Sequence, residues 1–325
     1  MKAWQKNPPI QKGQTSATGL ALTGKKGTQL RIIKTQPAKR LKRHLMSSLN
    51  KTEEQPIIFL DSGIGSIPYV NHFRSVNNKE KIILIADREN FPYGSKSKED
   101  LIKISLSLTE ELILSYNPKI IIVACNTASV SALDALREKF PSVPFVGTVP
   151  AVKPAVLFSK KRCIGVLGTR RTVEDPYIQE LNLEHGPDCS IITRASPELV
   201  DFVEHRWLTA DKNEKLSAVK PWIDIFKDSG IDALVLSCTH FLLLREEFNF
   251  LAKDNLAIFD SIDGVVNRIE SLLQANQSTK ENINQLPSLI VRGETDSPYW
   301  EKLCSHFNYE FLGCKKSFLD PEKDA

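Results

Sequence analysis

The chain has 325 residues, with 43 Lys and Arg against 39 Asp and Glu, so its formal net charge is +4. Its 41% apolar and 25% charged residues are typical of a soluble globular protein, and no run of about 20 apolar residues could span a bilayer. Six cysteines without a C-x-x-C pair argue against a disulfide scaffold and against a structural zinc site. The beginning of the chain has no secretory hydrophobic region, so we expect a cytoplasmic protein with reduced thiols.

The charge is distributed unevenly along the chain. Residues 1–50 contain eleven Lys and Arg and no acidic residue, so the remainder carries a net charge of −7. We interpret residues 1–55 as a basic, disordered tail. Met46 lies shortly before the first predicted strand, and a translation start there would leave most of the tail untranslated. Nucleic-acid binding by the tail is the weaker interpretation, because its basic residues are scattered and Trp4 is its only aromatic residue.

From residue 56 onward, short apolar runs alternate with amphipathic segments. The predicted strands are Ile57–Leu60, Lys81–Ala86, Ile120–Ala124, Phe145–Thr148, Cys163–Leu167, Ser190–Thr193, Ala233–Ser237, Ala257–Asp260 and Ser288–Arg292. The predicted helices include Lys98–Tyr116, Val130–Phe140, Ala151–Phe158, Pro176–Leu183, Pro197–His205, Asp211–Ser229 and Asp263–Gln274. Continuous apolar strands separated by helices predict an α/β fold with mostly parallel sheets, in which ligands bind beyond the carboxyl ends of the strands.

Polar clusters follow four of these strands, and two of the clusters resemble each other. The segments Asn117–Thr127 and Ser229–His240 each contain a turn, an apolar strand, a Cys and a nearby Thr. Cys125 and Cys238 are 113 residues apart, which is about the length of one domain. The repetition predicts two similar α/β lobes, each placing one thiol at a strand end. We expect the other four cysteines, Cys163, Cys189, Cys304 and Cys314, to be small buried apolar residues.

Two thiols on facing lobes suit proton removal from one face of a carbon atom and proton return to the other. A thiol that precedes a helix can have a lowered pKa, because the helix N-terminus favours the thiolate. Nearby acids and imidazoles can assist proton transfer, and we expect Asp61, His240 and Glu204 in this role. Backbone N–H groups near Gly63, Gly65 and Gly94 can hold carboxylates, together with the hydroxyls of Ser62, Thr127 and Thr239.

These motifs resemble those of the glutamate racemases, cofactor-independent enzymes of the aspartate/glutamate racemase superfamily. The resemblance extends from about residue 56 to residue 313, and its six motifs occur in the family's order. They are Asp61–Gly65, Phe91–Gly94, Ala124–Ser129, Gly168–Thr172, Leu199–Glu204 and Ser237–Phe241. The chain departs from the family's pattern at Ser66, at Ser196 and at Phe241-Leu242, and none of these changes removes a proposed catalytic group.

The resemblance implies two lobes with the active site between them. We expect the first lobe to comprise residues 56–149 and 245–325, and the second to comprise residues 150–244. Cys125 and Cys238 would be the two acid/base residues, with Asp61 assisting Cys125, and His240 and Glu204 assisting Cys238. The matching substrate-binding positions are Asp61, Ser62, Tyr93, Gly94, Asn126, Thr127, Thr239 and His240.

The same resemblance implies a cytoplasmic isomerase that supplies D-glutamate for peptidoglycan. It implies a homodimer without membrane or nucleic-acid partners, and no pyridoxal phosphate, metal or nucleotide cofactor. Two alternatives remain open from the residues alone. One is a related two-cysteine racemase that acts on aspartate or another acid. The other is a non-catalytic binding or regulatory protein, against which the presence of both thiols argues.

Overall fold

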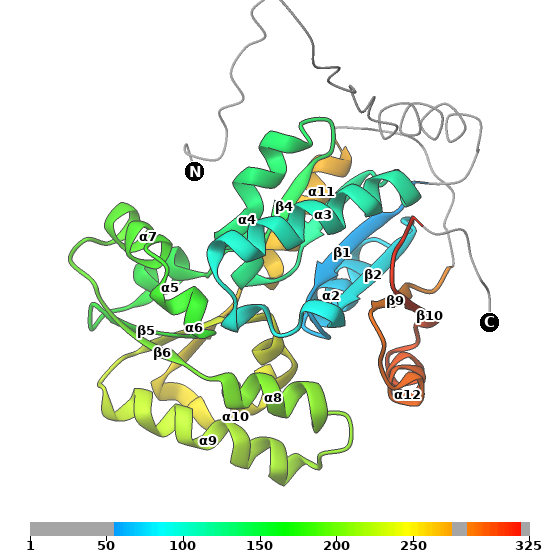
Figure 1. The fold of residues 1–325 in the computed structure, drawn as a ribbon. Helices are drawn as coiled ribbons and strands as arrows, with labels where there is room; N and C mark the ends of the chain where they lie inside the picture. Colours follow the sequence, from blue (N-terminus) through cyan, green and yellow to red (C-terminus); the bar gives the residue numbers. More distant parts are fainter. Residues whose placement is uncertain (1–54, 275–284, 320–325) are drawn as a thin grey trace, which may run out of the picture. The chain divides into compact units, whose positions relative to one another are not determined.

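The computed structural model describes residues 55–274 and 285–319, and the predicted basic tail lies almost entirely outside these ranges. The described residues form two parallel β-sheets, each packed between helices (Figure 1). Among these residues, no helix combines the length and the apolar character needed to cross a membrane.

The first lobe is built on a six-stranded sheet with the order β10-β9-β2-β1-β3-β4. Its strands are β1 (Ile57–Asp61), β2 (Ile82–Asp87), β3 (Ile120–Val123), β4 (Phe145–Gly147), β9 (Ser288–Arg292) and β10 (Glu310–Lys315). Its helices are α2 (Ile67–Val76), α3 (Lys98–Tyr116), α4 (Asn126–Lys139), α11 (Ile262–Gln274) and α12 (Ser297–Phe307). Two short 3₁₀ helices, η1 (Arg88–Asn90) and η2 (Tyr93–Ser95), follow β2.

The second lobe is built on a four-stranded sheet with the order β6-β5-β7-β8. Its strands are β5 (Cys163–Gly168), β6 (Ser190–Ala195), β7 (Ala233–Ser237) and β8 (Ala257–Phe259). Its helical segments are α5 (Val152–Phe158), α6 (Arg170–Glu174), α7 (Tyr177–His185), α8 (Pro197–His205), α9 (Lys212–Asp228), η3 (Thr239–Leu244), α10 (Arg245–Ala252) and η4 (Lys253–Asn255).

The strand orders confirm the predicted similarity of the two lobes. The strands β2-β1-β3-β4 of the first sheet correspond in order and direction to β6-β5-β7-β8 of the second. The first lobe differs by adding β9 and β10 at one edge. In this correspondence β3 matches β7, and these are the strands that precede Cys125 and Cys238.

Alternation along the strands supplies both faces of each sheet with apolar side chains. Ile57 and Phe59 of β1 face one core cluster, whereas Ile58 and Leu60 face another that includes α3 and α4. The first of these clusters also contains Leu234 and Leu236 of β7. The two lobes therefore share one continuous apolar core on one side, which fixes the position of one sheet relative to the other.

Local capping explains where the principal helices begin and end. Ser97 accepts a hydrogen bond from the backbone of Asp100 at the start of α3, and Asn117 ends that helix in the left-handed conformation. A reciprocal capping box joins Asp211 and Glu214 at the start of α9. These signals lie in the sequence, and the predicted bounds of both helices agree with the structure to within about one residue.

The predicted boundary between the lobes at residue 244 does not agree with the observed strand pairing. β8 pairs with β7, and α10 packs on α9 and β8, so residues 245–259 lie with the second sheet. The chain returns to the first lobe at α11, which packs on α2 and β4. Apolar periodicity predicts that Ala257–Phe259 is a strand but contains no information about which sheet edge it joins. Four helices, α2, α6, α10 and α12, and the edge strand β10 are also absent from the predicted elements.

Candidate active site

The two cysteines of the repeated motif lie at equivalent positions in the two lobes. Cys125 directly precedes α4, and Cys238 directly precedes η3, each in an extended conformation at the end of its strand. Both residues are buried, and both line one cavity of about 630 Å³. The structure therefore brings the two thiols, which are 113 positions apart in the sequence, to a single site.

Most of the predicted substrate-binding residues line this cavity, and they come from both lobes. Ser62, Tyr93, Gly94, Asn126, Thr127, Thr239 and His240 all line it. Asp61 and Glu204 do not line it, although both are buried. These two carboxylates lie behind the cavity wall, so they can act on the thiols and on neighbouring side chains rather than by holding a ligand directly.

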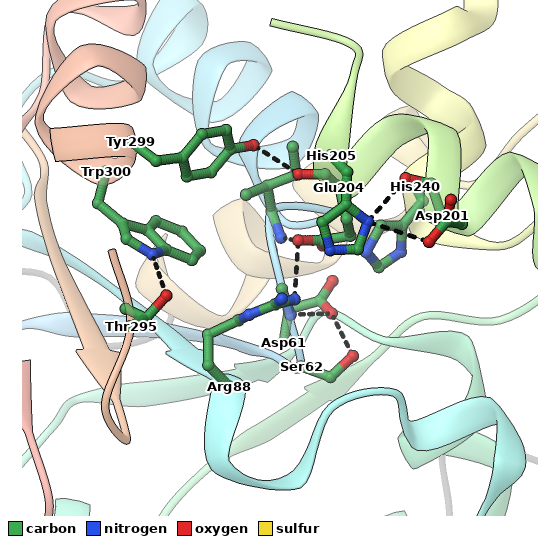
Figure 2. Close-up of polar contacts among 12 residues, drawn as sticks. Asp61, Ser62, Arg88, Asp201, Glu204, His205, His240, Thr295, Tyr299 and Trp300 are labelled. Carbon is green, nitrogen blue, oxygen red and sulfur yellow. Dashed lines mark hydrogen bonds and ion pairs between the residues drawn. The ribbon is translucent and has the colours of Figure 1, made fainter. Parts of the chain in front are cut away.

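A series of polar contacts connects Cys238 to His240 and His240 to Glu204. The sulfur of Cys238 lies 3.8 Å from Nδ1 of His240, whose Nε2 lies 2.5 Å from Oε1 of Glu204. The backbone N–H of Ile64 donates to the same Glu204 oxygen at 2.9 Å. The second Glu204 oxygen accepts a hydrogen bond of 2.9 Å from Nη1 of Arg88, as Figure 2 shows. Glu204 therefore joins His240 of the second lobe to the loop that follows β2 in the first.

This network favours the charged forms of His240 and Glu204. Burial alone lowers the pKa of His240, but its hydrogen bonds with Cys238 and Glu204 raise that pKa well above the ordinary value. Burial alone raises the pKa of Glu204, but the hydrogen bond and charge of His240, with Arg88 and the Ile64 N–H, bring it below its ordinary value. Each charged group of the pair thus stabilises the charge of the other.

The surroundings of Cys125 are different. Burial raises the pKa of its thiol well above the ordinary value, and the charge of Asp61 adds to that effect. The backbone N–H groups of Ala128 and Thr127 act in the opposite direction but do not compensate. The expected lowering of the Cys125 pKa by the start of its helix is therefore wrong, because desolvation exceeds the stabilisation of the thiolate by α4. Cys125 is a neutral thiol at neutral pH.

Asp61 is held by three donors from the two lobes. Ser62 Oγ and the backbone N–H of Gly63 contact its Oδ1 at 3.4 and 3.2 Å, and Thr239 Oγ1 donates to Oδ2 at 2.9 Å. Burial raises the pKa of Asp61, although the charge of His240 and the Thr239 hydrogen bond oppose that rise. No hydrogen bond from Asp61 to Cys125 is found among the described residues, so its influence on that thiol is through charge.

Asn126 has buried polar atoms that point to a ligand. It is 2% exposed, it lines the cavity, and neither its Oδ1 nor its Nδ2 has a hydrogen-bond partner among the described residues. Leaving such atoms unpaired costs about 1–3 kcal/mol, so a bound molecule with both donors and acceptors would satisfy them. An amino acid carries both kinds of group on one small framework.

Hydroxyl groups from both lobes meet next to the cavity. Thr127 Oγ1 lies 2.8 Å from Thr169 Oγ1 and 3.3 Å from Thr172 Oγ1. Gly94 approaches Thr169 so closely that an added Cβ would lie 2.9 Å from the threonine Cβ. Glycine at position 94 therefore allows the loop after β2 to close against the second lobe.

Several residues of the site are absent from the predicted set. Asp87 accepts a hydrogen bond of 2.7 Å from the hydroxyl of Tyr93, and Arg88 reaches Glu204. Asp87 ends β2 and Arg88 follows it, so the strand-end rule used for the other clusters could have found both. His205 is exposed near the end of α8, where it contacts Asp201 (Figure 2). Cys314 is exposed and Cys163 is partly buried, in contrast to the prediction that both are buried.

Comparisons with known proteins identify the family of this chain. Residues 70–269 match the family model described as Asp/Glu/Hydantoin racemase. The chain is 33% identical over 274 residues to a glutamate racemase from Treponema pallidum strain Nichols, covering 83% of this chain and 99% of that protein. It is 37% identical over 221 residues to one from Sphingopyxis alaskensis, covering 67% and 82% respectively.

Two solved structures have the same fold over most of their length. The glutamate racemase of Escherichia coli, solved with L-glutamate and the activator UDP-MurNAc-Ala, has a TM-score of 0.71 and 29% identity, covering 80% of this chain and 98% of that one. A glutamate racemase of Bacillus anthracis has a TM-score of 0.68 and 26% identity, covering 81% and 97%. The chain therefore belongs to the Asp/Glu/Hydantoin racemase family, and within that family to the glutamate racemases.

Proposed function

We propose that this racemase interconverts L- and D-glutamate by proton transfer between the substrate Cα and two thiols, Cys125 and Cys238. The observation that carries the proposal is the meeting of these thiols, from equivalent strands of two similar lobes, in one cavity. Acid/base residues on opposite sides of a planar carbanion are what inversion at carbon requires.

Glutamate as the substrate is supported by the relatives and by the polar groups of the cavity. The Escherichia coli relative was solved with L-glutamate. In this chain, the unpaired amide of Asn126 and the hydroxyls of Ser62, Thr127 and Thr239 line the cavity, where they can bind the two carboxylates and the ammonium group. Aspartate, which is one methylene shorter, is the alternative substrate.

The charge states of the site suggest which thiol begins each direction. His240 can donate its Nδ1–H to the Cys238 sulfur when that residue gives up its proton, whereas burial favours the neutral form of the Cys125 thiol by raising its pKa. In one direction, the Cys238 thiolate takes the Cα proton and the C–H electron pair remains on the carbanion. The Cys125 thiol then donates its proton to the opposite face and becomes a thiolate. The reverse direction begins from that second state, and exchange with solvent connects the two states.

The experiment that tests this function is incubation in D2O with L-glutamate and, separately, with D-glutamate. We expect deuterium at Cα by NMR, together with loss of optical activity, from either enantiomer. L-aspartate should react at a much lower rate. No wash-in from either glutamate enantiomer would contradict the proposed activity, and faster wash-in with aspartate would transfer it to the alternative substrate.

The cellular role and the assembly state follow only from the relationship to the family. We propose that the D-glutamate enters peptidoglycan synthesis in the cytoplasm, and that the enzyme acts as a homodimer without nucleic acid. Light scattering of the full chain should give twice the monomer mass, and a mass of one chain under assay conditions would contradict the homodimer. Added DNA should change neither the mass nor the rate.

A further inference from the structure

Arg88 lies beside the cavity wall and pairs with the buried Glu204. It follows β2, its side chain is 17% exposed, and its Nη1 lies 2.9 Å from Oε2 of Glu204, whose side chain is 1% exposed. The guanidinium also lies over the ring of Phe91, 4.0 Å from its centroid. Phe91 lines the cavity, and its ring centroid is 6.3 Å from that of His240. Arg88 thus contacts the cavity wall and the carboxylate behind it at the same time.

The Glu204 carboxylate has a defined donor for each oxygen. Oε1 accepts from the Ile64 N–H and faces His240 Nε2, so only Oε2 remains for Arg88. The backbone carbonyl of Glu204 accepts a hydrogen bond of 2.8 Å from the Tyr299 hydroxyl, which fixes the main chain as well (Figure 2). Gly63 leaves the space that Oε1 occupies, since an added Cβ would lie 1.8 Å from that oxygen. The orientation of Glu204 toward His240 therefore depends on Arg88 holding the other oxygen.

We propose that Arg88 is a positioning residue for proton transfer at Cys238, acting through Glu204 and His240. The inference rests on the proposed function, because it assigns Arg88 to one of the two thiols. Asp61, on the side of Cys125, is held by hydroxyl and backbone donors instead of a guanidinium. Arg88 therefore makes the two halves of the site chemically different.

The physical effect of Arg88 is on the position that Glu204 takes toward His240. Without the guanidinium, the buried carboxylate would lose the donor to Oε2 and would be free to turn its Oε1 away from His240. The His240 ring would then lose the partner that fixes its Nδ1 toward the sulfur of Cys238. Proton abstraction by Cys238 should then slow, while abstraction by Cys125 should not.

The variants that test this role are Arg88→Met, which keeps most of the aliphatic stem, and Arg88→Lys, which keeps the charge without the planar fork. The matched control is Arg74→Met, because Arg74 also lies over an aromatic ring, that of Tyr309, whereas the described residues show no ion pair between Arg74 and Glu204. The readout is the primary deuterium isotope effect on kcat/KM with 2-deuterated L-glutamate and with 2-deuterated D-glutamate, alongside kcat for both directions.

We expect Arg88→Met to lower kcat by about tenfold to a hundredfold, the rate equivalent of one charge-assisted hydrogen bond. The isotope effect should rise for the enantiomer deprotonated by Cys238 and fall for the other enantiomer. Arg88→Lys should restore part of the rate and of the original isotope effects, and Arg74→Met should match the wild type. Suppose that the wild type shows normal deuterium wash-in, and that the two isotope effects of Arg88→Met change equally or not at all. This result would overturn the role of Arg88 but not the proposed function. A wild-type enzyme without wash-in would instead overturn the proposed function.

Discussion

Thr239 Oγ1 of the second lobe donates a hydrogen bond of 2.9 Å to Oδ2 of Asp61 in the first lobe. The residue that directly follows Cys238 therefore holds the carboxylate expected to assist Cys125. Both residues are at most 1% exposed, so this contact between the lobes is shielded from water. It couples the geometry of one half of the site to that of the other, and a change at Thr239 should affect both thiols.

Replacement of Thr239 tests this coupling. Thr239→Val has nearly the same shape but removes the donor, which leaves a buried carboxylate oxygen with one partner fewer. We expect a loss of about 1–3 kcal/mol in the free energy of unfolding, together with a lower kcat. Thr239→Ser keeps the hydroxyl and should retain most of both quantities. Denaturant unfolding and steady-state racemisation measure the effects, and equal behaviour of the Val and Ser variants would refute the role of the hydroxyl.

Alanine substitutions at two glycines, one at the site and one as a control, test the close contact between Gly63 and Glu204. Gly63→Ala should nearly abolish activity, because the new Cβ would lie 1.8 Å from Glu204 Oε1 and would displace the carboxylate from His240. Gly264→Ala, in α11, has nothing within 4 Å and should stabilise the helix by up to about 1 kcal/mol with unchanged activity. Racemisation rates and unfolding midpoints of both variants decide the matter, and an active Gly63→Ala enzyme would contradict the described Glu204 position.

The buried pair of Glu204 and His240 predicts a pH-dependent contribution to stability. The lowered pKa of Glu204 means that its contribution is present above its ordinary value of 4.5 and is lost as the pH falls through the folded-state value. The raised pKa of His240 means that its contribution is present below 6.5 and is lost as the pH rises through the folded-state value. The pair should therefore stabilise the fold most between about pH 4.5 and 6.5, and the His240 contribution should decline above that range.

Thermal unfolding of wild type and Glu204→Gln across the pH range tests this expectation. The gap in Tm should be widest between about pH 4.5 and 6.5, where breaking a buried pair costs about 3 kcal/mol, and should narrow at lower and at higher pH. Glu301→Gln, at an exposed position of α12, is the control and should leave Tm unchanged. A gap of constant size at every pH would show that the Glu204 charge contributes nothing.

Because cationic side chains line the cavity, we expect substrate binding to depend on the salt concentration. Lys96 and the exposed Arg170 line the cavity, although residues 51–325 carry a net charge of −7. Arg170→Ala should raise KM a few-fold at low ionic strength with kcat unchanged, and the difference should vanish near 1 M salt, where the screening length is about 3 Å. Lys98 is close in sequence to Lys96 but does not line the cavity, so Lys98→Ala should have no effect. A lower kcat in Arg170→Ala would indicate a role in the chemical step instead.

Much of this architecture could be predicted because the signals are local. The apolar runs before Cys125 and Cys238 identify buried strands, and their repetition identifies two lobes with the same strand order. The lobe to which Ala257–Phe259 belongs could not be predicted, because short apolar strands fit either sheet and only tertiary packing selects one. The edge strand β10 has alternating partial burial without a strong apolar run, which explains its absence from the prediction.

The site was predictable as a set of strand-end residues, but its connections were not. The sequence predicts Asp61 and Glu204 as part of the site, yet it does not show that they lie behind the cavity wall. Arg88 contacts Glu204 across 116 positions of the chain, a pairing that no spacing rule contains. The pKa of Cys125 was predicted in the wrong direction because helix position is visible in a sequence, whereas the degree of burial is not.

The central claim is that Cys125 and Cys238 are both required and act on opposite faces of the same carbon atom. The most direct measurement is racemisation of L- and D-glutamate, followed by circular dichroism, for Cys125→Ser, Cys238→Ser and the control Cys314→Ser. Cys314 is exposed and lies outside the cavity lining, so its variant should retain the wild-type rate. Each of the other two variants should lose at least about a thousandfold in kcat in both directions, since the serine hydroxyl is a far weaker acid than a thiol. Near-normal racemisation by either Cys125→Ser or Cys238→Ser would contradict the two-thiol account.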